Sequence, residues 1–227
     1  MLMIKGIVRW FFQLAFFAAV FLIPAGTLLW PRAIQFLVGF GLLSLLEIVA
    51  LALWAPASLE ARVEKGIVKD QPTADRVASA LLGLINLVWF IFVAVDANRL
   101  HLLPKPPLWL AVLGAAVFLV GYAIMTAAVF QNAFAAPIVG DQTERNQVVI
   151  DTGWYGAVRH PLYLGYLLFL AGLALWLEST AALVVLPIAF APVIARILIE
   201  EKTLRKNLPG YAEYMDTVRF RLVLGVW

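Results

Sequence analysis

Long apolar runs, broken by short polar segments, set the pattern of the chain as far as about residue 199. A helix needs about 20 apolar residues to cross the hydrocarbon core of a bilayer. Four runs reach that length, and two further runs follow with only two residues between them. The pattern therefore predicts membrane-spanning helices at residues 10–30, 33–54, 77–95, 108–130, 161–177 and 180–199.

The last two runs differ from the first four. The run at 161–177 has 17 residues, and as a helix it covers roughly 25 Å, slightly less than a full span. The run at 180–199 contains Pro187 and Pro192, which we expect to kink it. The two runs form either a tight antiparallel pair or a partly inserted hairpin. We therefore predict an all-α integral membrane protein with five to six transmembrane helices, the last two as a tight hairpin.

The composition supports a membrane protein. Hydrophobic residues make up 63% of the chain and charged residues 14%, whereas an average soluble domain is about half apolar and a quarter charged. The chain has no cysteine, which excludes disulfides, thiolate metal sites and a cysteine nucleophile. Its two histidines, His101 and His160, are too few for a multi-histidine metal centre. We expect neither a metal nor a nucleic acid among its partners.

The basic residues predict how the helices are oriented. Lysine and arginine concentrate in the cytoplasmic loops of membrane proteins. If all six runs cross, one side holds 14 of the 17 basic residues and the other holds Arg32, Arg99 and Lys105. We therefore expect a multi-pass protein with both termini and the loop at 131–160 in the cytoplasm. The 14 residues on that side are Lys5, Arg9, Arg62, Lys65, Lys69, Arg76, Arg145, Arg159, Arg196, Lys202, Arg205, Lys206, Arg219 and Arg221.

The cytoplasmic loop at 55–76 contains a short amphipathic stretch. Leu59 and Val63 are four residues apart, with charged residues between them. Ser58 is suited to cap the start of a helix there, and Gly66 is suited to end it. The stretch predicts a short helix at the membrane interface, with a solvated connector as the alternative.

A polar cluster opens the fifth run, where Arg159 and His160 precede Pro161. The residue before a proline avoids the helical conformation and proline suits the first helical position, so we expect a helix to begin at Pro161. The N-terminus of that helix favours an anion. Tyr163 lies in its first turn, and Gly165 lets another group approach closely. The alternative is a basic membrane flank with interfacial tyrosines.

A second polar cluster closes the sixth run. Arg196 and Glu200 are four residues apart and share a helix face. The apolar residues between them put the pair near the membrane boundary, where a charge is costly without a purpose. Glu201 adds a second carboxylate on a different face. The alternative is a surface ion pair that contributes little.

Two segments carry a resemblance to a known family. They are GWYGAVRHPLYLG, at 153–165, and RILIEEKTLRKNLPGYAEY, at 196–214. Together they resemble the isoprenylcysteine carboxyl methyltransferase family, part of a wider group of membrane methyltransferases that includes phospholipid N-methyltransferases. The shared elements are G-x-Y-x-x-x-R-H-P-x-Y-x-G, then R-x-x-x-E-E-x-x-L, then Y-x-x-Y, and the resemblance covers about residues 130–221.

The resemblance implies S-adenosylmethionine-dependent methyl transfer to a membrane-associated acceptor, a lipid or a prenylated carboxylate. It implies that residues 131–227 form a cofactor-binding loop, a helix pair and a cytoplasmic tail, continuous with the four helices of residues 1–130 as one domain. Arg196 is the implied catalytic residue, on the substrate side. Arg159, at the helix N-terminus, suits the carboxylate of the methionine part. The other implied cofactor-binding residues are Gln147, Val148, Val149, Ile150, Tyr155, His160, Tyr163 and Glu200.

Glu47, deep in the second run, is a further candidate for the substrate site. An ionisable side chain inside a membrane usually has a functional role. The alternative is that Glu47 pairs with Asn86 of the third run and links the two helices. Two other functions stay open on the sequence. One is an NADPH-dependent membrane reductase of the sterol-reductase type, and the other is a non-enzymatic transporter or scaffold.

Overall fold

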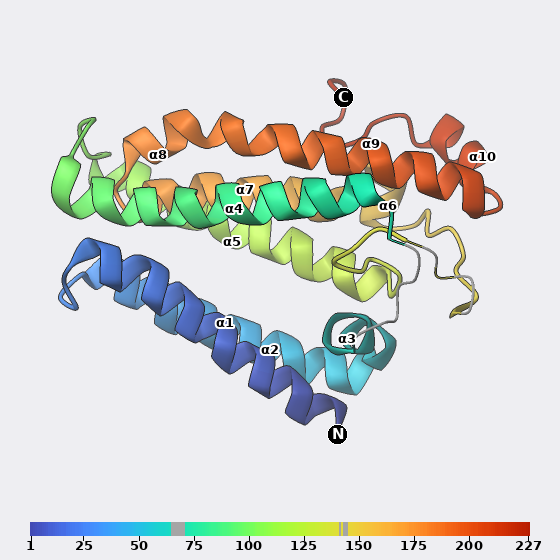
Figure 1. Cartoon of the computed structure of the whole chain (residues 1–227), viewed down its shortest axis with the longest axis horizontal. Coiled ribbons are helices and arrows are strands. Elements are labelled where there is room, and N and C mark those ends of the chain that lie inside the picture. The colour runs from blue at the N-terminus through green and yellow to red at the C-terminus, as the bar shows by residue number, and fades with distance from the viewer. Residues whose placement is uncertain (65–70, 141, 143–144) are drawn as a thin grey trace.

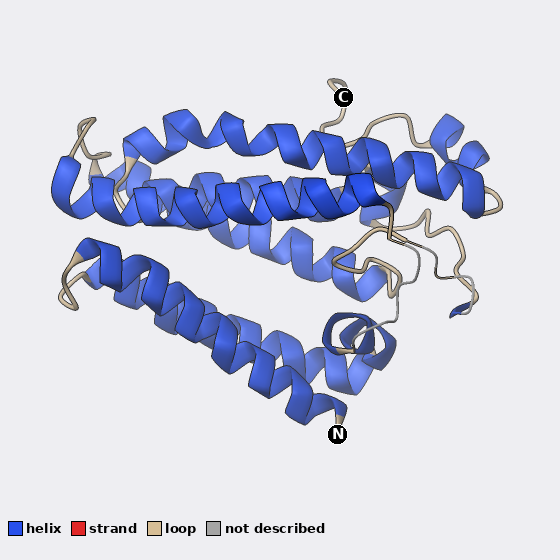
Figure 2. Ribbon diagram, viewed as in Figure 1, coloured by secondary structure: helices blue, strands red, loops and turns tan. Residues whose placement is uncertain are grey.

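The computed structural model describes residues 1–64, 71–140, 142 and 145–227, and every regular element within them is a helix (Figure 2). Within these described ranges, five helical segments are long and apolar enough to cross a membrane. They are Leu2–Ala25, Pro31–Trp54, Thr73–Leu100, Leu108–Gln131 and Thr180–Asn207, and Pro161–Trp176 is a shorter apolar helix. The prediction of an all-α integral membrane protein is confirmed.

The first two helices, α1 at Leu2–Ala25 and α2 at Pro31–Trp54, form an antiparallel hairpin (Figure 1). α1 begins well before residue 10, because Lys5 and Arg9 interrupt the apolar pattern without interrupting the helix. It ends at Gly26, whose left-handed backbone (φ 71°) lets its N–H reach two carbonyls of the last turn.

A short helix, α3 at Pro56–Val63, follows and packs against both helices of the hairpin (Figure 1). Its buried Leu59 and Val63 join an apolar cluster with α2 and α5. The helix predicted in this loop is therefore present, but the predicted cap at Ser58 is wrong. The helix begins at Pro56, which suits the first helical position, and Ser58 lies inside it. Gly66, its expected end, lies outside the described residues.

α4 at Thr73–Val95 continues into one π-helical turn, η1 at Asp96–Leu100, and the chain returns as α5 at Leu108–Gln131. The buried carboxylate of Asp96 accepts a hydrogen bond of 2.5 Å from the hydroxyl of Ser179. That bond fixes the turn after α4 to the link that precedes α8.

A seam of glycines joins α5 to α7, which spans Pro161–Trp176. A Cβ on Gly121 would stand 2.5 Å from the carbonyl oxygen of Gly165, and a Cβ on Gly172 would stand 2.4 Å from that of Gly114. Real Cβ atoms essentially never come closer than 3.0 Å to such a neighbour, so only glycine permits this helix spacing. The close approach predicted at Gly165 is confirmed.

The last long segment is interrupted: α8 at Thr180–Val185, the 3₁₀ turn η3 at Leu186–Ala189, and α9 at Phe190–Asn207. Pro187 lies in this interruption, which agrees with the break predicted there, whereas Pro192 lies in the first turn of α9. The segment runs antiparallel to α7 after a short link, as the predicted hairpin requires. However, α7 makes its most extensive contact with α5, and α9 makes its most extensive contact with α4. A turn at Gly210 leads into α10, at Tyr211–Thr217.

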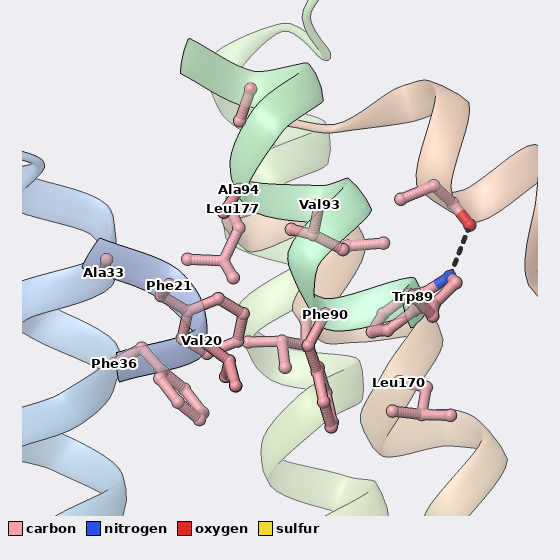
Figure 3. Packing of buried hydrophobic residues seen from close by; sticks show 14 of the residues in the cluster. Val20, Phe21, Ala33, Phe36, Trp89, Phe90, Val93, Ala94, Leu170 and Leu177 are labelled. Atoms are coloured by element: carbon pink, nitrogen blue, oxygen red, sulfur yellow. Dashed lines mark hydrogen bonds between the residues drawn. The ribbon is translucent and has the colours of Figure 1, made fainter. Parts of the chain in front are cut away.

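Aromatic side chains connect the α1–α2 hairpin to the other helices (Figure 3). The ring of Phe17 in α1 packs edge-to-face on Phe36 of α2 and on Phe90 of α4, with centroids 5.5 and 5.4 Å apart. Beside Phe90, Trp89 donates its indole N–H to the carbonyl of Ala182 at 2.9 Å (Figure 3). α4 therefore lies between the hairpin and α8 and binds to both.

Both chain ends lie in the half of the molecule that contains α3 and α10 (Figure 1). The α1–α2 link, the η1 turn and the link from α7 to α8 lie at the opposite end. There Glu178 pairs with Arg32 at 3.3 Å and with Lys105 at 3.4 Å. The split of basic residues was counted for six crossings, whereas five helical segments of the described residues are long enough to cross and Pro161–Trp176 is shorter.

Candidate functional site

The C-terminal tail fixes the start of α7. Pro161 occupies the first helical position, and His160 before it has the predicted non-helical backbone (φ −126°, ψ 61°). The backbone N–H groups of Arg159 and His160 donate to the carbonyls of Phe220 and Arg221, each at 2.9 Å. The tail therefore lies along the segment before α7 and fixes the backbone of Arg159 and His160.

One buried carboxylate, that of Glu201 in α9, contacts three basic side chains. One of its oxygens accepts from Arg159 Nε at 2.7 Å and lies 3.2 Å from His160 Nε2. The other oxygen accepts from Arg221 Nε at 2.9 Å. Arg159 Nη1 donates to two carbonyls of the tail, at 2.7 and 2.9 Å. Arg159, predicted to bind cofactor, thus directs its donors at Glu201 and the tail.

Glu200, the preceding residue of α9, faces a different set of groups. Its carboxylate accepts from the Tyr163 hydroxyl at 3.4 Å and lies 3.9 Å from His160 Nδ1. The Glu200 side chain is 29% exposed, whereas that of Glu201 is 5% exposed. Because side chains of successive helical residues point about 100° apart, the two carboxylates contact two different sets of groups.

A small cavity of about 80 Å³ lies beside Glu200, at the first turn of α7. Six of the predicted cofactor residues line it: Gln147, Tyr155, Arg159, His160, Tyr163 and Glu200. The loop after α5 supplies lining residues that the sequence did not single out, among them Asn132, Phe134 and Ala136. The predicted cofactor set therefore comes together here in large part.

Tyr155 reaches the small cavity from a short helix, α6 at Trp154–Ala157. Its backbone carbonyl accepts a hydrogen bond of 2.7 Å from the hydroxyl of Tyr214, which ties α6 to α10. Burial, and after it the Glu200 carboxylate, raise the pKa of the Tyr155 hydroxyl. Tyr155 is therefore a neutral phenol with its ring beside the cavity.

The predicted adenosine segment reaches the small cavity only at Gln147. Val148 is 57% exposed, and Ile150 is half-buried. Val149 packs instead against the cluster formed by α10 and its flanks, which consists of Leu208, Tyr211, Tyr214 and Val218. The segment has no regular secondary structure, because so short an apolar run has no partner strand within the described residues.

Arg196, the predicted catalytic residue, lies outside the lining of the small cavity. Its Nε donates to the fully buried carboxylate of Asp75 at 3.1 Å, and its Nη2 donates to the carbonyl of Pro137 at 2.8 Å. Asp75 also accepts from the backbone N–H of Val139 at 3.1 Å. Arg196 and Asp75 together therefore hold the loop after α5 against α4 and α9. Asp75 was missed, and its only signal was an acidic residue at the start of an apolar run.

A second, larger cavity of about 670 Å³ lies between the α1–α2 hairpin and helices α3, α4, α5 and α7. Glu47 lines it and accepts a hydrogen bond from the hydroxyl of Tyr122. Asn86, on another wall, accepts one from the hydroxyl of Tyr166. Glu47 and Asn86 therefore each bind a tyrosine, and the alternative in which they pair with each other is wrong.

The two cavities adjoin. Ala135, Ala136 and Leu162 line both of them. Leu162 follows His160 by two residues in the first turn of α7, and the two alanines belong to the loop that Arg196 holds. A molecule in the large cavity would thus meet a molecule in the small one at this boundary, beside His160 and Tyr163.

The segment of the chain that forms most of the small cavity matches a known protein family. Residues 109–209 match the phospholipid methyltransferase family. The match runs from α5 to the end of α9, so it contains the whole predicted cofactor set, and it confirms the resemblance over that part of the chain.

A curated relative matches a shorter stretch. The cobalt-zinc-cadmium resistance protein CzcN of Cupriavidus metallidurans is 37% identical over 71 residues, which is 31% of this chain and 33% of that protein. The alignment thus spans about a third of the relative's length. Within the part of the chain that the structure describes, no group of three or more histidine, cysteine or acidic side chains is placed to hold a metal ion.

Proposed function

We propose that the protein transfers a methyl group from S-adenosylmethionine to a lipidic acceptor drawn from the membrane. The observation that carries the proposal is the meeting of two cavities at Ala135, Ala136 and Leu162. One cavity is small, has polar as well as apolar walls, and lies among the residues implied for the cofactor. The other is large and mostly apolar, and lies among membrane-spanning helices.

The residues of the small cavity suit the chemistry of this cofactor. S-adenosylmethionine supplies an electrophilic methyl group on a positively charged sulfonium. Glu200 offers a carboxylate, and the rings of Tyr155 and Tyr163 offer faces that attract a cation. The first turn of α7 offers backbone N–H groups to a carboxylate, and the amide of Gln147 suits a polar edge of the base.

The small cavity must widen to hold the whole cofactor. Its volume of about 80 Å³ is below the range of roughly 300–1,000 Å³ that is typical of ligand pockets. The large cavity, at about 670 Å³, already lies within that range. We therefore assign the large cavity to the apolar chain of the acceptor and the boundary at Leu162 to the site of transfer.

Residues of this chain would then act by position. Because methyl transfer is a direct displacement, the protein contributes mainly alignment of the two reactants and exclusion of water. His160 and Tyr163 border the boundary, and Arg196 holds the loop that carries Ala135 and Ala136. Arg196 is thus proposed as a positioning residue for transfer. The excess of basic residues supports a cytoplasmic position for this end of the molecule.

Binding of S-adenosylhomocysteine, the product, tests the proposal. Purified protein in neutral detergent should bind it in a calorimetric titration, and a parallel titration with NADPH should show no binding. Protein that unfolds cooperatively yet binds no S-adenosylhomocysteine would sink the proposal. Binding of NADPH alone would favour the reductase alternative. A radiolabelled methyl donor added to membranes, followed by separation of lipids from proteins, then identifies the acceptor.

A further inference from the structure

We propose that Arg62, on α3, binds the anionic head group of the methyl acceptor, and that the acceptor is therefore an acidic amphiphile. The head group is a carboxylate or a phosphate, and its apolar chain lies in the large cavity. This inference rests on the proposed function. It concerns a residue outside the stretch that matches the phospholipid methyltransferase family, which begins at residue 109.

α3 brings Arg62 to the boundary between the two cavities. Arg62 lines the large cavity. Its neighbours Leu59 and Val63 are buried in the apolar cluster against which Leu162 packs, and Leu162 belongs to both cavities. The arginine therefore lies at the end of the large cavity that adjoins the small one.

The position of Arg62 is held by backbone contacts. One guanidinium nitrogen donates to the carbonyl of Ser58 at 3.0 Å, one turn earlier in α3. The carbonyl of Arg62 accepts a hydrogen bond from Arg9 of α1. Lys5 of α1 pairs with Glu64 just after α3. These contacts anchor α3 to α1, so the guanidinium stands on a fixed element.

The groups that act on Arg62 come from both cavities. Burial lowers the pKa of Arg62, and two groups oppose that effect: the Glu47 carboxylate, which lines the large cavity, and the hydroxyl of Tyr155, which lines the small one. Arginine stays charged in proteins. A fixed positive charge therefore lies between the apolar cavity and the cofactor residues.

The charge balance of the large cavity favours an anion over an amine. Among the residues that the structure describes, its charged lining consists of Arg9, Arg62 and Glu47. Glu47 already accepts a hydrogen bond from Tyr122. An ammonium head group at the boundary would meet a guanidinium, whereas a carboxylate or phosphate matches the planar fork of arginine.

An acidic head group also suits the chemistry. An oxyanion attacks the methyl carbon, the carbon–sulfur bond breaks with its electron pair going to sulfur, and the products are a methyl ester and S-adenosylhomocysteine. No proton is released, because the oxyanion is ionised before the step. The reaction therefore needs no general base at the boundary, and an arginine there fits the reactant.

Competition binding tests the inference. Protein in neutral detergent is loaded with tritiated oleic acid in a scintillation proximity assay, and oleyl alcohol, oleylamine and oleoyl lysophosphatidic acid compete for the site. Wild-type protein should prefer oleic acid to oleyl alcohol by about tenfold, because an arginine–carboxylate hydrogen bond contributes on that order. Arg62→Gln should lose the preference, and Arg62→Lys should keep part of it. Whichever of the two acids competes better identifies the head group.

Arg76→Gln is the matched control, since Arg76 is an exposed arginine that does not line the large cavity. It should keep the preference for the acid. Titration with S-adenosylhomocysteine on each variant separates this inference from the proposed function. If Arg62→Gln binds S-adenosylhomocysteine normally and still prefers the acid, the role of Arg62 is wrong and the proposed function stands. A wild-type preference for oleylamine would have the same meaning. Arg62-dependent acid binding without any S-adenosylhomocysteine binding would keep the anion site and refute methyl transfer.

Discussion

At the residue scale, two adjacent carboxylates have different tasks. Glu201 is buried and pairs with Arg159 and Arg221. Glu201→Gln should destabilise the protein by about 3 kcal/mol, because it leaves the buried guanidinium of Arg159 without its counter-ion. Thermal unfolding in detergent, followed by circular dichroism, measures the loss.

Glu200→Gln is the natural control for that change, one position away. Its side chain is partly exposed and lies beside the small cavity, so the variant should unfold like the wild type. It should also bind S-adenosylhomocysteine about tenfold more weakly. If Glu200→Gln unfolded as early as Glu201→Gln, the division of roles between the two carboxylates would be wrong.

A second residue-scale prediction concerns Arg196 and its partner Asp75. If Arg196 acts by holding the loop at Pro137, then Arg196→Gln and Asp75→Asn should reduce methyl transfer to membranes by similar factors. Because the two residues are in direct contact, the double variant should lose little more than either single variant. Transfer of radiolabelled methyl groups measures all three.

Different effects of the two substitutions would contradict a shared role of Arg196 and Asp75. Full turnover in Asp75→Asn, together with no turnover in Arg196→Gln, would show that Arg196 contacts the acceptor itself. Thermal unfolding of each variant provides the control. Removing Arg196 alone leaves the buried carboxylate of Asp75 without its counter-ion. It should therefore destabilise the protein more than removing both charges does.

Individual site residues were predictable from the sequence wherever a local rule applied. The proline rule placed the start of α7 at Pro161 and the non-helical backbone at His160. The partners of charged residues were not predictable in this way. Arg196 and Asp75 are 121 positions apart, and no local pattern relates them. Arg159 likewise binds the tail, 59 positions away, through contacts that only the fold creates.

At the element scale, the α5–α7 contact depends on glycine. Gly121→Ala should destabilise the protein by about 1–3 kcal/mol, because its Cβ would stand 2.5 Å from backbone atoms of α7 and would force the helices apart. Gly39→Ala, in α2, should have almost no effect, since a Cβ there meets nothing within 4 Å. Thermal unfolding of the two variants in the same detergent compares them. Equal midpoints would show that α5 and α7 tolerate a wider spacing.

The elements themselves were largely predictable, and their packing was not. Run length and apolar content identified every long helix, since a bilayer imposes both. The helix ends were predicted less well. α1 extends through Lys5 and Arg9, because isolated basic residues near a helix end do not stop a helix. Which helices pack together depends on small residues, and only Gly165 gave a hint of the α5–α7 pair.

At the scale of the whole molecule, α3, α6 and α10 lie in the same half (Figure 1), and Tyr155 of α6 lines the small cavity. The split of basic residues predicts that this half faces the cytoplasm. This orientation determines where a cofactor dissolved in the cytoplasm would enter. The predicted orientation would also determine from which leaflet an acceptor reaches the large cavity, which Arg9 and Arg62 line.

Because the chain has no cysteine, single cysteines report this orientation without background. Lys206→Cys, on the exposed last turn of α9, should react with a membrane-impermeant maleimide only in inverted membrane vesicles. Lys105→Cys, at the opposite end and with a side chain 52% exposed, should react in intact cells. Labelling after detergent solubilisation controls for reactivity of each thiol. Reaction of Lys206→Cys in intact cells would reverse the orientation and place the small cavity away from the cytoplasm, and labelling of both positions from the same side would mean that the number of crossings between them is even.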